Sequence, residues 1–212
     1  MISRNTRALT FLLSLTTLLG SAQLPPNIPQ LASDVSPLLI GEKTPDLSVQ
    51  NTSNDEVRIQ ALFGIKPTVL IFYRGGWCPY CNLHLAELQG IEQEILKEGY
   101  QIVAISPDSP ENLKKSIEKN KIDYQLFSDA NMELSRAFGI AFAVSEASKE
   151  RLNISSGGKN PGMLPVPSVF VVNQKGDILF EYINPDYKMR LKGNLLLAVL
   201  KELKEPPRCA NH

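Results

Sequence analysis

Hydrophobic residues in this chain form short continuous runs that alternate with segments of helical periodicity. The runs at residues 68–73 (TVLIFY) and 101–106 (QIVAIS) are too continuously apolar for half-exposed strands, so each predicts a strand buried on both faces. Between them, apolar side chains recur every three or four residues from Leu85 to Ile95, which predicts a helix that ends near Gly99. The chain is therefore predicted to fold here as strand, helix and strand.

The alternation continues toward the C-terminus. Ser109 and Pro110 suit the N-cap and first position of a charged helix that extends to about Lys119. The remaining elements are shorter: a strand at 126–127, a helix at 132–138, a hairpin of strands at 168–172 and 178–182, and a closing helix at 191–203. Residues 141–164 break the rhythm around a Gly-Gly-Lys-Asn-Pro-Gly run, and we expect an exposed insertion there.

This order of elements predicts the fold class. Strands alternating with helices, followed by a hairpin and a helix, are typical of an α/β fold with a mixed sheet flanked by helices on both faces. The domain is expected to span residues 39–204, followed by a C-terminal tail at 205–212. Residues 23–38 carry four prolines and no periodicity, which predicts a linker.

The N-terminus has the features of a secretory signal peptide. Arg4 and Arg7 precede an apolar run at residues 8–19, and small residues at 20–22 follow it. We expect cleavage after Ala22, so that residues 1–22 are removed. An uncleaved anchor is the alternative, although the run is shorter than the about 20 residues of a membrane span. The mature protein is therefore expected to be exported, periplasmic or extracellular, without stable membrane insertion.

Charge and cysteine content argue against a nucleic-acid-binding protein and against a disulfide-stabilised scaffold. Lys plus Arg and Asp plus Glu both number 22, so no overall field favours nucleic acid. The three cysteines are too few for a disulfide scaffold. Cys78 and Cys81 form a Cys-x-x-Cys pair, which leaves Cys209 in the tail. In the oxidising surroundings of an exported protein, such a pair tends to form a disulfide.

The position of the pair favours thiol redox chemistry. Cys78 follows a buried strand and stands at the start of a predicted helix, where free backbone N–H groups and the helix dipole stabilise a thiolate. Gly75 and Gly76 allow a tight turn before it, and Pro79 suits the first helical position. Cys81, three residues further on, lies on the same helix face and is expected to be the more buried sulfur.

Two other uses of the pair are disfavoured. A structural zinc ion needs four ligands, and the other candidates are only His84, His212 and Cys209 of the tail. A structural disulfide across three residues closes too small a loop to stabilise the fold appreciably. We therefore predict a redox-active Cys78–Cys81 pair with no metal and no cofactor, in which Cys78 attacks a disulfide substrate and Cys81 resolves.

Several segments resemble a known family. The strand–Cys-x-x-Cys–helix order and the later Val166-Pro167-Ser168 resemble the thioredoxin fold. IGEKTPDLSV (40–49), VAISPDSPENLKKS (103–116) and LFSDANMELSRAFGI (126–140) are similar to the peroxiredoxins, the alkyl hydroperoxide reductase/thiol-specific antioxidant (AhpC/TSA) family. The resemblance covers about residues 39–204. It implies a thioredoxin-like fold, thiol-dependent peroxide reduction, and a cis-proline at Pro167 that faces the redox pair.

The active-site pattern of that family is only partly present. In its Pro-x-x-x-Thr-x-x-Cys pattern Cys81 takes the place of the peroxidatic cysteine, whereas Arg74 and Cys78 replace the proline and the threonine. Pro167 takes the position of the arginine that the family supplies from a later strand. We therefore expect slow peroxide turnover, because groups that stabilise the developing oxyanion are missing. Arg74 could supply the missing positive charge near the thiolate, or it could be a solvated charge in the loop.

The leading function is thus an exported, peroxiredoxin-like antioxidant oxidoreductase that cycles the Cys78–Cys81 pair and reduces peroxides. The first alternative is thioredoxin-type exchange with protein disulfides, and the second is a non-catalytic redox-sensing or binding module. The expected partner is a thiol electron donor such as a thioredoxin-like protein. Trp77 is predicted either to shield the pair and offer partners a contact surface or simply to pack.

Overall fold

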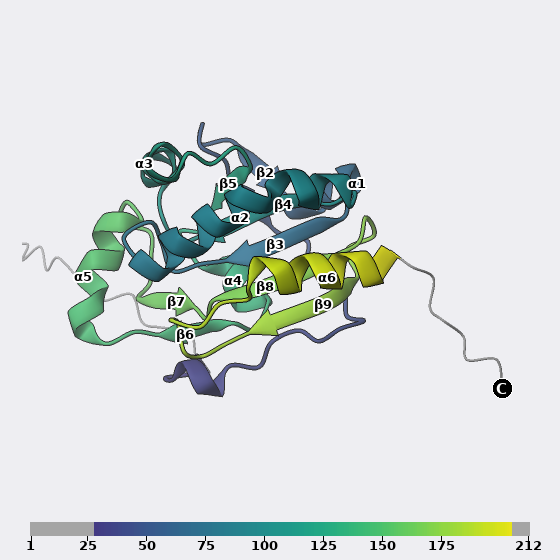
Figure 1. Ribbon diagram of the computed structural model, residues 1–212. Helices are drawn as coiled ribbons and strands as arrows, with labels where there is room; N and C mark the ends of the chain where they lie inside the picture. The colour runs from purple at the N-terminus through teal and green to yellow at the C-terminus, as the bar shows by residue number, and fades with distance from the viewer. Residues whose placement is uncertain (1–27, 205–212) are drawn as a thin grey trace, which may run out of the picture.

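A seven-stranded mixed sheet lies at the centre of the protein, with the strand order β2-β1-β5-β4-β3-β8-β9 (Figure 1). The computed structural model describes residues 28–204, so the predicted signal peptide and the tail with Cys209 lie outside the described residues. The strands of this sheet are β1 (Ser48–Gln50), β2 (Glu56–Arg58), β3 (Thr68–Phe72), β4 (Gln101–Ser106), β5 (Gln125–Ser128), β8 (Ser168–Val172) and β9 (Ile178–Ile183).

The pairing of the strands is parallel in the middle and antiparallel at both sides. β3, β4 and β5 run parallel to one another, whereas β8 and β9 form an antiparallel hairpin beside β3. β1 pairs antiparallel with β5 and with β2. The predicted α/β class with a mixed sheet is confirmed, as is the hairpin near the C-terminus.

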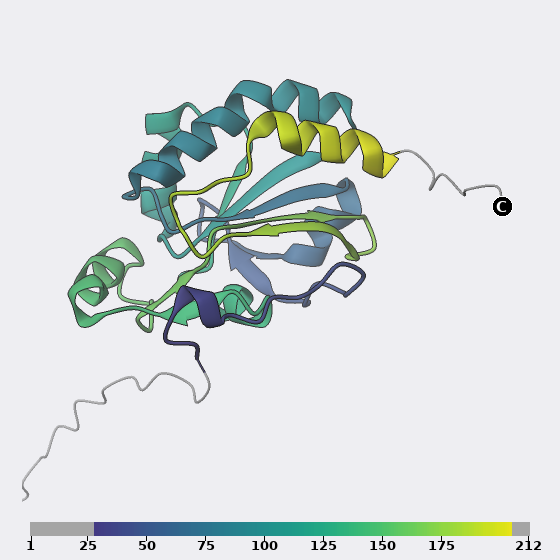
Figure 2. The same ribbon diagram turned by 60° about the horizontal axis from the view of Figure 1, so that its bottom comes forward.

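Helices cover both faces of this sheet (Figure 2). α2, α3 and α6 contribute to the core on one face, while α1 and α4 contribute to the core on the other face. The helices are α1 (Ile59–Ile65), α2 (Pro79–Lys97), α3 (Pro110–Asn120), α4 (Glu133–Ala137), α5 (Glu146–Ser155) and α6 (Gly193–Lys204), with a short 3-10 helix at Ala32–Asp34.

Side chains of the central strands alternate between the two cores, as side chains of an extended chain must. In β3, Val69 and Ile71 point into the core under α2, whereas Leu70 and Phe72 point into the opposite core. This explains the continuous apolar run, because both faces of the strand are covered.

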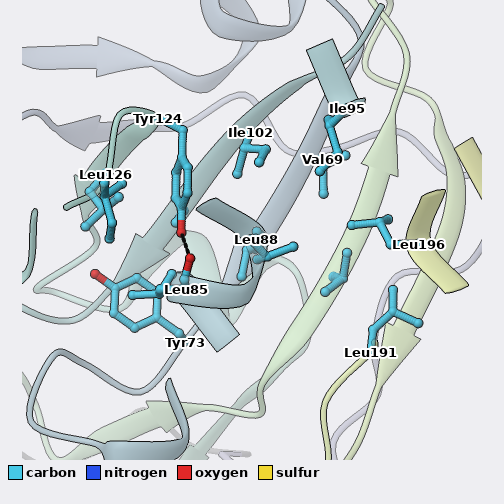
Figure 3. Packing of buried hydrophobic residues seen from close by; sticks show 14 of the residues in the cluster. Val69, Tyr73, Leu85, Leu88, Ile95, Ile102, Tyr124, Leu126, Leu191 and Leu196 are labelled. Atoms are coloured by element: carbon cyan, nitrogen blue, oxygen red, sulfur yellow. Dashed lines mark hydrogen bonds between the residues drawn. The ribbon is translucent and has the colours of Figure 1, made fainter. Parts of the chain in front are cut away.

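Figure 3 shows the first core from close by, where Leu85, Leu88 and Ile95 of α2 pack toward the sheet and toward α6. The hydroxyl of Tyr124 donates to the carbonyl oxygen of Leu85 at 2.9 Å, which satisfies that buried polar group. The helix that carries the cysteines is thus anchored along its buried face.

Residues 141–164 differ from the expected exposed insertion. They form β6 (Ala141–Ala143), α5 and β7 (Met163–Pro165), and β6 pairs antiparallel with β7. Leu152, Met163 and Leu164 are buried. The prediction was wrong because the Gly-Gly-Lys-Asn-Pro-Gly turn lies between a helix and a strand that are each too short for a clear periodicity.

The described part of the predicted linker packs against the domain. The carbonyl oxygen of Pro29 accepts a hydrogen bond from the Ala143 amide at 2.8 Å, and the Leu38 amide donates to Phe138 at 3.1 Å. Leu38 also contacts the second core. Residues 28–38 therefore extend the folded unit beyond the expected start at 39. Within residues 28–204, none of the helices has the length and apolar character needed to cross a bilayer.

Candidate active site

The cysteines follow a tight turn between β3 and α2. Gly75 has φ +130°, a conformation that side chains with a Cβ rarely adopt. The Gly76 amide donates to Asp108 Oδ2 at 2.6 Å, and the Gly76 carbonyl oxygen accepts from Asn82 Nδ2 at 2.8 Å. Contacts from the segment after β4 and from α2 thus hold both the N–H and the C=O of Gly76.

Cys78 is the N-cap residue of α2, and Pro79 opens the helix. The Cys78 carbonyl oxygen accepts hydrogen bonds from the amides of Cys81 and Asn82, each at 3.1 Å. Both cysteines are free thiols and both are buried, with 1% of Cys78 and 0% of Cys81 exposed. Cys81 belongs to the same core as Leu85, as the helical spacing predicts.

The two thiols differ in acidity. The pKa of Cys78 is lowered to about 6, first by a hydrogen bond from the Cys81 side chain, and further by the Cys81 backbone and the positive charges of Arg74 and Arg190. The pKa of Cys81 is raised well above that of an ordinary thiol, because it donates to Cys78, is desolvated and faces the Cys78 charge. Near neutral pH the pair therefore holds one thiolate, at Cys78, with a protonated Cys81 behind it.

Arg190 is a site residue that the sequence did not indicate. It lies in the segment between β9 and α6, and its Nη2 donates to Cys81 Sγ at 3.4 Å. The expectation that Pro167 leaves the pair without a later arginine is therefore wrong: a cation reaches it from a loop 109 residues away. No local pattern distinguishes this arginine from a solvated surface residue, which is why sequence reasoning missed it.

Arg74 and Trp77 form a stacked cluster at the turn. The Arg74 guanidinium carbon lies 5.2 Å from the Trp77 ring centroid and 4.1 Å from that of Tyr187. Tyr187 also makes an edge contact with Tyr80 at 5.7 Å between centroids, and Arg151 lies over Trp77 at 5.3 Å. Arg74 is thus fixed by aromatic rings, with its charge close enough to lower the Cys78 pKa.

Pro167 lies close to two residues of the site, His84 and Arg190. It is buried directly before β8 and, with His84 and Arg190, lines a small cavity of about 10 Å³. No cis peptide bond occurs within residues 28–204, so the cis form expected at Pro167 is not found. Burial and the charge of Arg190 lower the pKa of His84 to about 4, which leaves its imidazole neutral at physiological pH.

Comparison with known proteins is consistent with this geometry. The sequence model of the AhpC/TSA family matches residues 40–180. The chain belongs to the AhpC/TSA family. It is a thiol-dependent oxidoreductase with the thioredoxin-like fold of the peroxiredoxins, as predicted.

Individual relatives have low sequence identity to this chain, but the similarity covers most of their own length. Peroxiredoxin Bcp of Bacillus subtilis is 25% identical over 168 residues, which cover 78% of this chain and 97% of that protein. The putative peroxiredoxin bcp of Haemophilus influenzae is 27% identical over 106 residues, covering 50% of this chain and 68% of its own length. The crystal structure of peroxidoxin BcpB from Mycobacterium tuberculosis has the same fold, with a TM-score of 0.62 at 21% identity over 78% of this chain and 98% of that one.

Proposed function

We propose that the protein reduces peroxides by cycling Cys78 and Cys81 between dithiol and disulfide, with Cys78 as the attacking thiolate. The observation that carries this proposal is the asymmetry of the pair: Cys78 has a pKa of about 6, whereas the pKa of Cys81 is raised. This order differs from the one that the family alignment implies, in which Cys81 attacks first.

The proposed chemistry has three steps. The Cys78 thiolate attacks one peroxide oxygen, the O–O bond breaks, and the departing oxygen takes up a proton and leaves as water or an alcohol. Cys78 becomes a sulfenic acid. The Cys81 thiol then attacks the Cys78 sulfur, which forms the disulfide and releases water. Two external thiols reduce the disulfide and leave as their own disulfide.

The surrounding cations fit the charge changes of this cycle. Arg74 and Arg190 both lower the pKa of Cys78, so they also stabilise the negative charge that builds up on the departing oxygen. Arg190 in addition contacts Cys81 Sγ, the sulfur that becomes the leaving thiolate when the disulfide is reduced. One loop arginine therefore serves both half-reactions.

Exchange with protein disulfides is a second candidate, which the Cys-x-x-Cys at a helix start supports. The burial of Cys78 favours the smaller substrate, because only 1% of the residue is exposed and a peroxide needs less opening of the turn than a folded protein does. Non-catalytic redox sensing is the third candidate, and an observation of repeated turnover with excess thiol would exclude it.

A paired assay of the reduced protein tests the proposal. Peroxide consumption is measured in one sample and reduction of a protein disulfide, such as that of insulin, in the other. We expect peroxide consumption to dominate and to be abolished by Cys78→Ser. Fast insulin reduction with negligible peroxide consumption would contradict the proposal and establish the exchange reaction instead.

We also propose that the protein acts outside the cytoplasm. The support is the charged and apolar N-terminal sequence, and a Cys-x-x-Cys pair in an oxidising compartment is readily converted to a disulfide.

A further inference from the structure

A cavity of about 540 Å³ opens directly beside the turn that carries the cysteines. Gly76 and Trp77, the two residues before Cys78, form one side of it, and side chains of α3 and α5 form the other sides. The two helices are tied together there, because the Ser155 carbonyl oxygen accepts from Asn112 Nδ2 and from the Ser109 amide, both at 2.8 Å. The volume is typical of a small-molecule site.

Asp108 lies against this cavity with a polar atom that has no partner. The residue is 1% exposed, and its Oδ2 accepts from the Gly76 amide. Its Oδ1 is buried and has no hydrogen-bond partner, and Asp108 is one of the residues that line the cavity. A buried acceptor without a partner is unfavourable, so a ligand that donates a hydrogen bond to Oδ1 gains affinity.

The rim of the cavity is mainly positive. Lys115, Lys119 and Arg151 line it, against the single rim carboxylate of Glu150. Lys115 donates to Asn112 Oδ1 at 3.0 Å, whereas the side chain of Lys119 makes no ion pair or hydrogen bond within the described part of the chain. These side chains are suited to a ligand with carboxylate groups at its outer end.

The geometry points to a binding site for the reducing substrate: a small thiol peptide with carboxylate groups, which face the rim cations, and an ammonium or amide donor, which faces Asp108. This inference rests on the proposed function, since such a thiol would regenerate the dithiol after each turnover. A small reductant also fits the burial of Cys78. A protein reductant could reach this sulfur only after a larger opening of the turn.

The reduction balances with two molecules of this thiol. The thiolate of the first attacks Cys78 Sγ of the Cys78–Cys81 disulfide. The S–S bond breaks, a mixed disulfide forms at Cys78, and the Cys81 sulfur leaves and takes up a proton. The second thiolate attacks the peptide sulfur of the mixed disulfide, which releases the oxidised peptide and restores the Cys78 thiolate.

Binding can be tested separately from activity with S-methylglutathione, an unreactive thiol-peptide derivative with two carboxylates and an ammonium group. Calorimetric titration of the reduced wild-type protein is expected to give saturable binding. Lys119→Glu is expected to weaken it by about tenfold or more, because one attractive charge becomes repulsive. Lys114→Glu is the matched control: Lys114 is exposed on the same helix but does not line the cavity, so its replacement should change affinity less than about twofold.

Two results would overturn the inference: no saturable binding by the wild-type protein at millimolar ligand, or equal weakening by both lysine variants. Peroxide consumption then separates the inference from the proposed function. With glutathione as reductant, Lys119→Glu should raise KM by about tenfold, whereas with uncharged dithiothreitol it should leave the rate unchanged. Absence of turnover with dithiothreitol would refute the proposed function but leave a measured S-methylglutathione site standing. Turnover with dithiothreitol and with a protein reductant, but not with glutathione, would refute this site alone.

Discussion

At the scale of single residues, the chemistry depends on unequal treatment of two neighbouring sulfurs. Cys78 ends an extended segment and receives hydrogen bonds from the helix that follows, whereas Cys81 is inside that helix and fully buried. Positive charge from Arg74 and Arg190 reaches Cys78 from two different loops. The pair is therefore poised with its charge on the sulfur nearer the helix start.

The first prediction concerns the pH dependence of Cys78. Its alkylation by iodoacetamide should rise with pH through a midpoint near 6 and level off above it, because the thiolate is already formed there. Cys81→Ala should move the midpoint up, since it removes the hydrogen bond that lowers this pKa most. Cys81→Ser, which retains a donor, should move it less. A midpoint that is the same in all three proteins would contradict the assignment.

The second prediction concerns Arg190. Arg190→Gln should raise the pKa of both cysteines and of His84, because the guanidinium lowers all three. The alkylation midpoint and the NMR titration of His84 report these shifts. Peroxide consumption should fall by roughly 10²-fold, as for loss of one preorganised donor. Lys188→Gln, an exposed neighbour in the same segment, is the control, and equal effects of the two variants would refute a specific role.

At the scale of elements, the site is made by one strand, one turn and one helix. β3 ends at Phe72, the turn reverses over six residues, and α2 begins at Pro79. The apolar run and the helical period made this unit predictable from sequence. The same holds for α3, which starts at Pro110 as the Ser-Pro pair indicates, although the Ser109 side chain forms no capping hydrogen bond.

What sequence reasoning missed has a physical reason. β1 and β2 have three residues each, too few for a periodic pattern, and β1 joins the sheet through β5, a segment distant in sequence. Arg190 likewise gains its role only from the packing that brings the segment before α6 against α2. Cys78, Cys81, Arg74 and Trp77 lie in one stretch and were accessible from the sequence.

The third prediction tests the turn. Gly75→Ala should lower the free energy of unfolding by roughly 1–3 kcal/mol, because φ is +130° and an added Cβ would lie 2.8 Å from Asp108 Oδ1. Gly90→Ala, at an exposed position of α2 with open space around it, should instead raise it by about 0.8–1.0 kcal/mol. Urea unfolding measures both, and a Gly75→Ala protein as stable as the wild type would contradict this account of the turn.

At the scale of the whole molecule, the sheet is covered on both faces, and the redox pair lies just after the end of β3, in the core that α2 covers. The 540 Å³ cavity and the Arg74–Trp77–Tyr187 cluster lie around the same turn. Structural elements from both halves of the chain thus converge on Cys78 and Cys81, while the sheet supplies a rigid support.

The fourth prediction belongs to the full-length chain. If the N-terminal segment is a cleaved signal peptide, the protein recovered from a bacterial periplasm or medium should begin at Gln23. Intact-mass measurement of fractionated cells gives the answer. An unprocessed product confined to the cytoplasm would contradict the proposal of export, without bearing on the redox site.

The order of attack is the central claim, and chemical trapping tests it most directly. Reduced Cys81→Ser and Cys78→Ser proteins are each treated with one equivalent of peroxide and with dimedone, which labels sulfenic acids, and the adducts are located by peptide mass spectrometry. We predict rapid labelling of Cys78 in the Cys81→Ser protein and little labelling in the Cys78→Ser protein. Rapid labelling of Cys81 in the Cys78→Ser protein, with an unlabelled Cys78 in the other, would show that Cys81 attacks first.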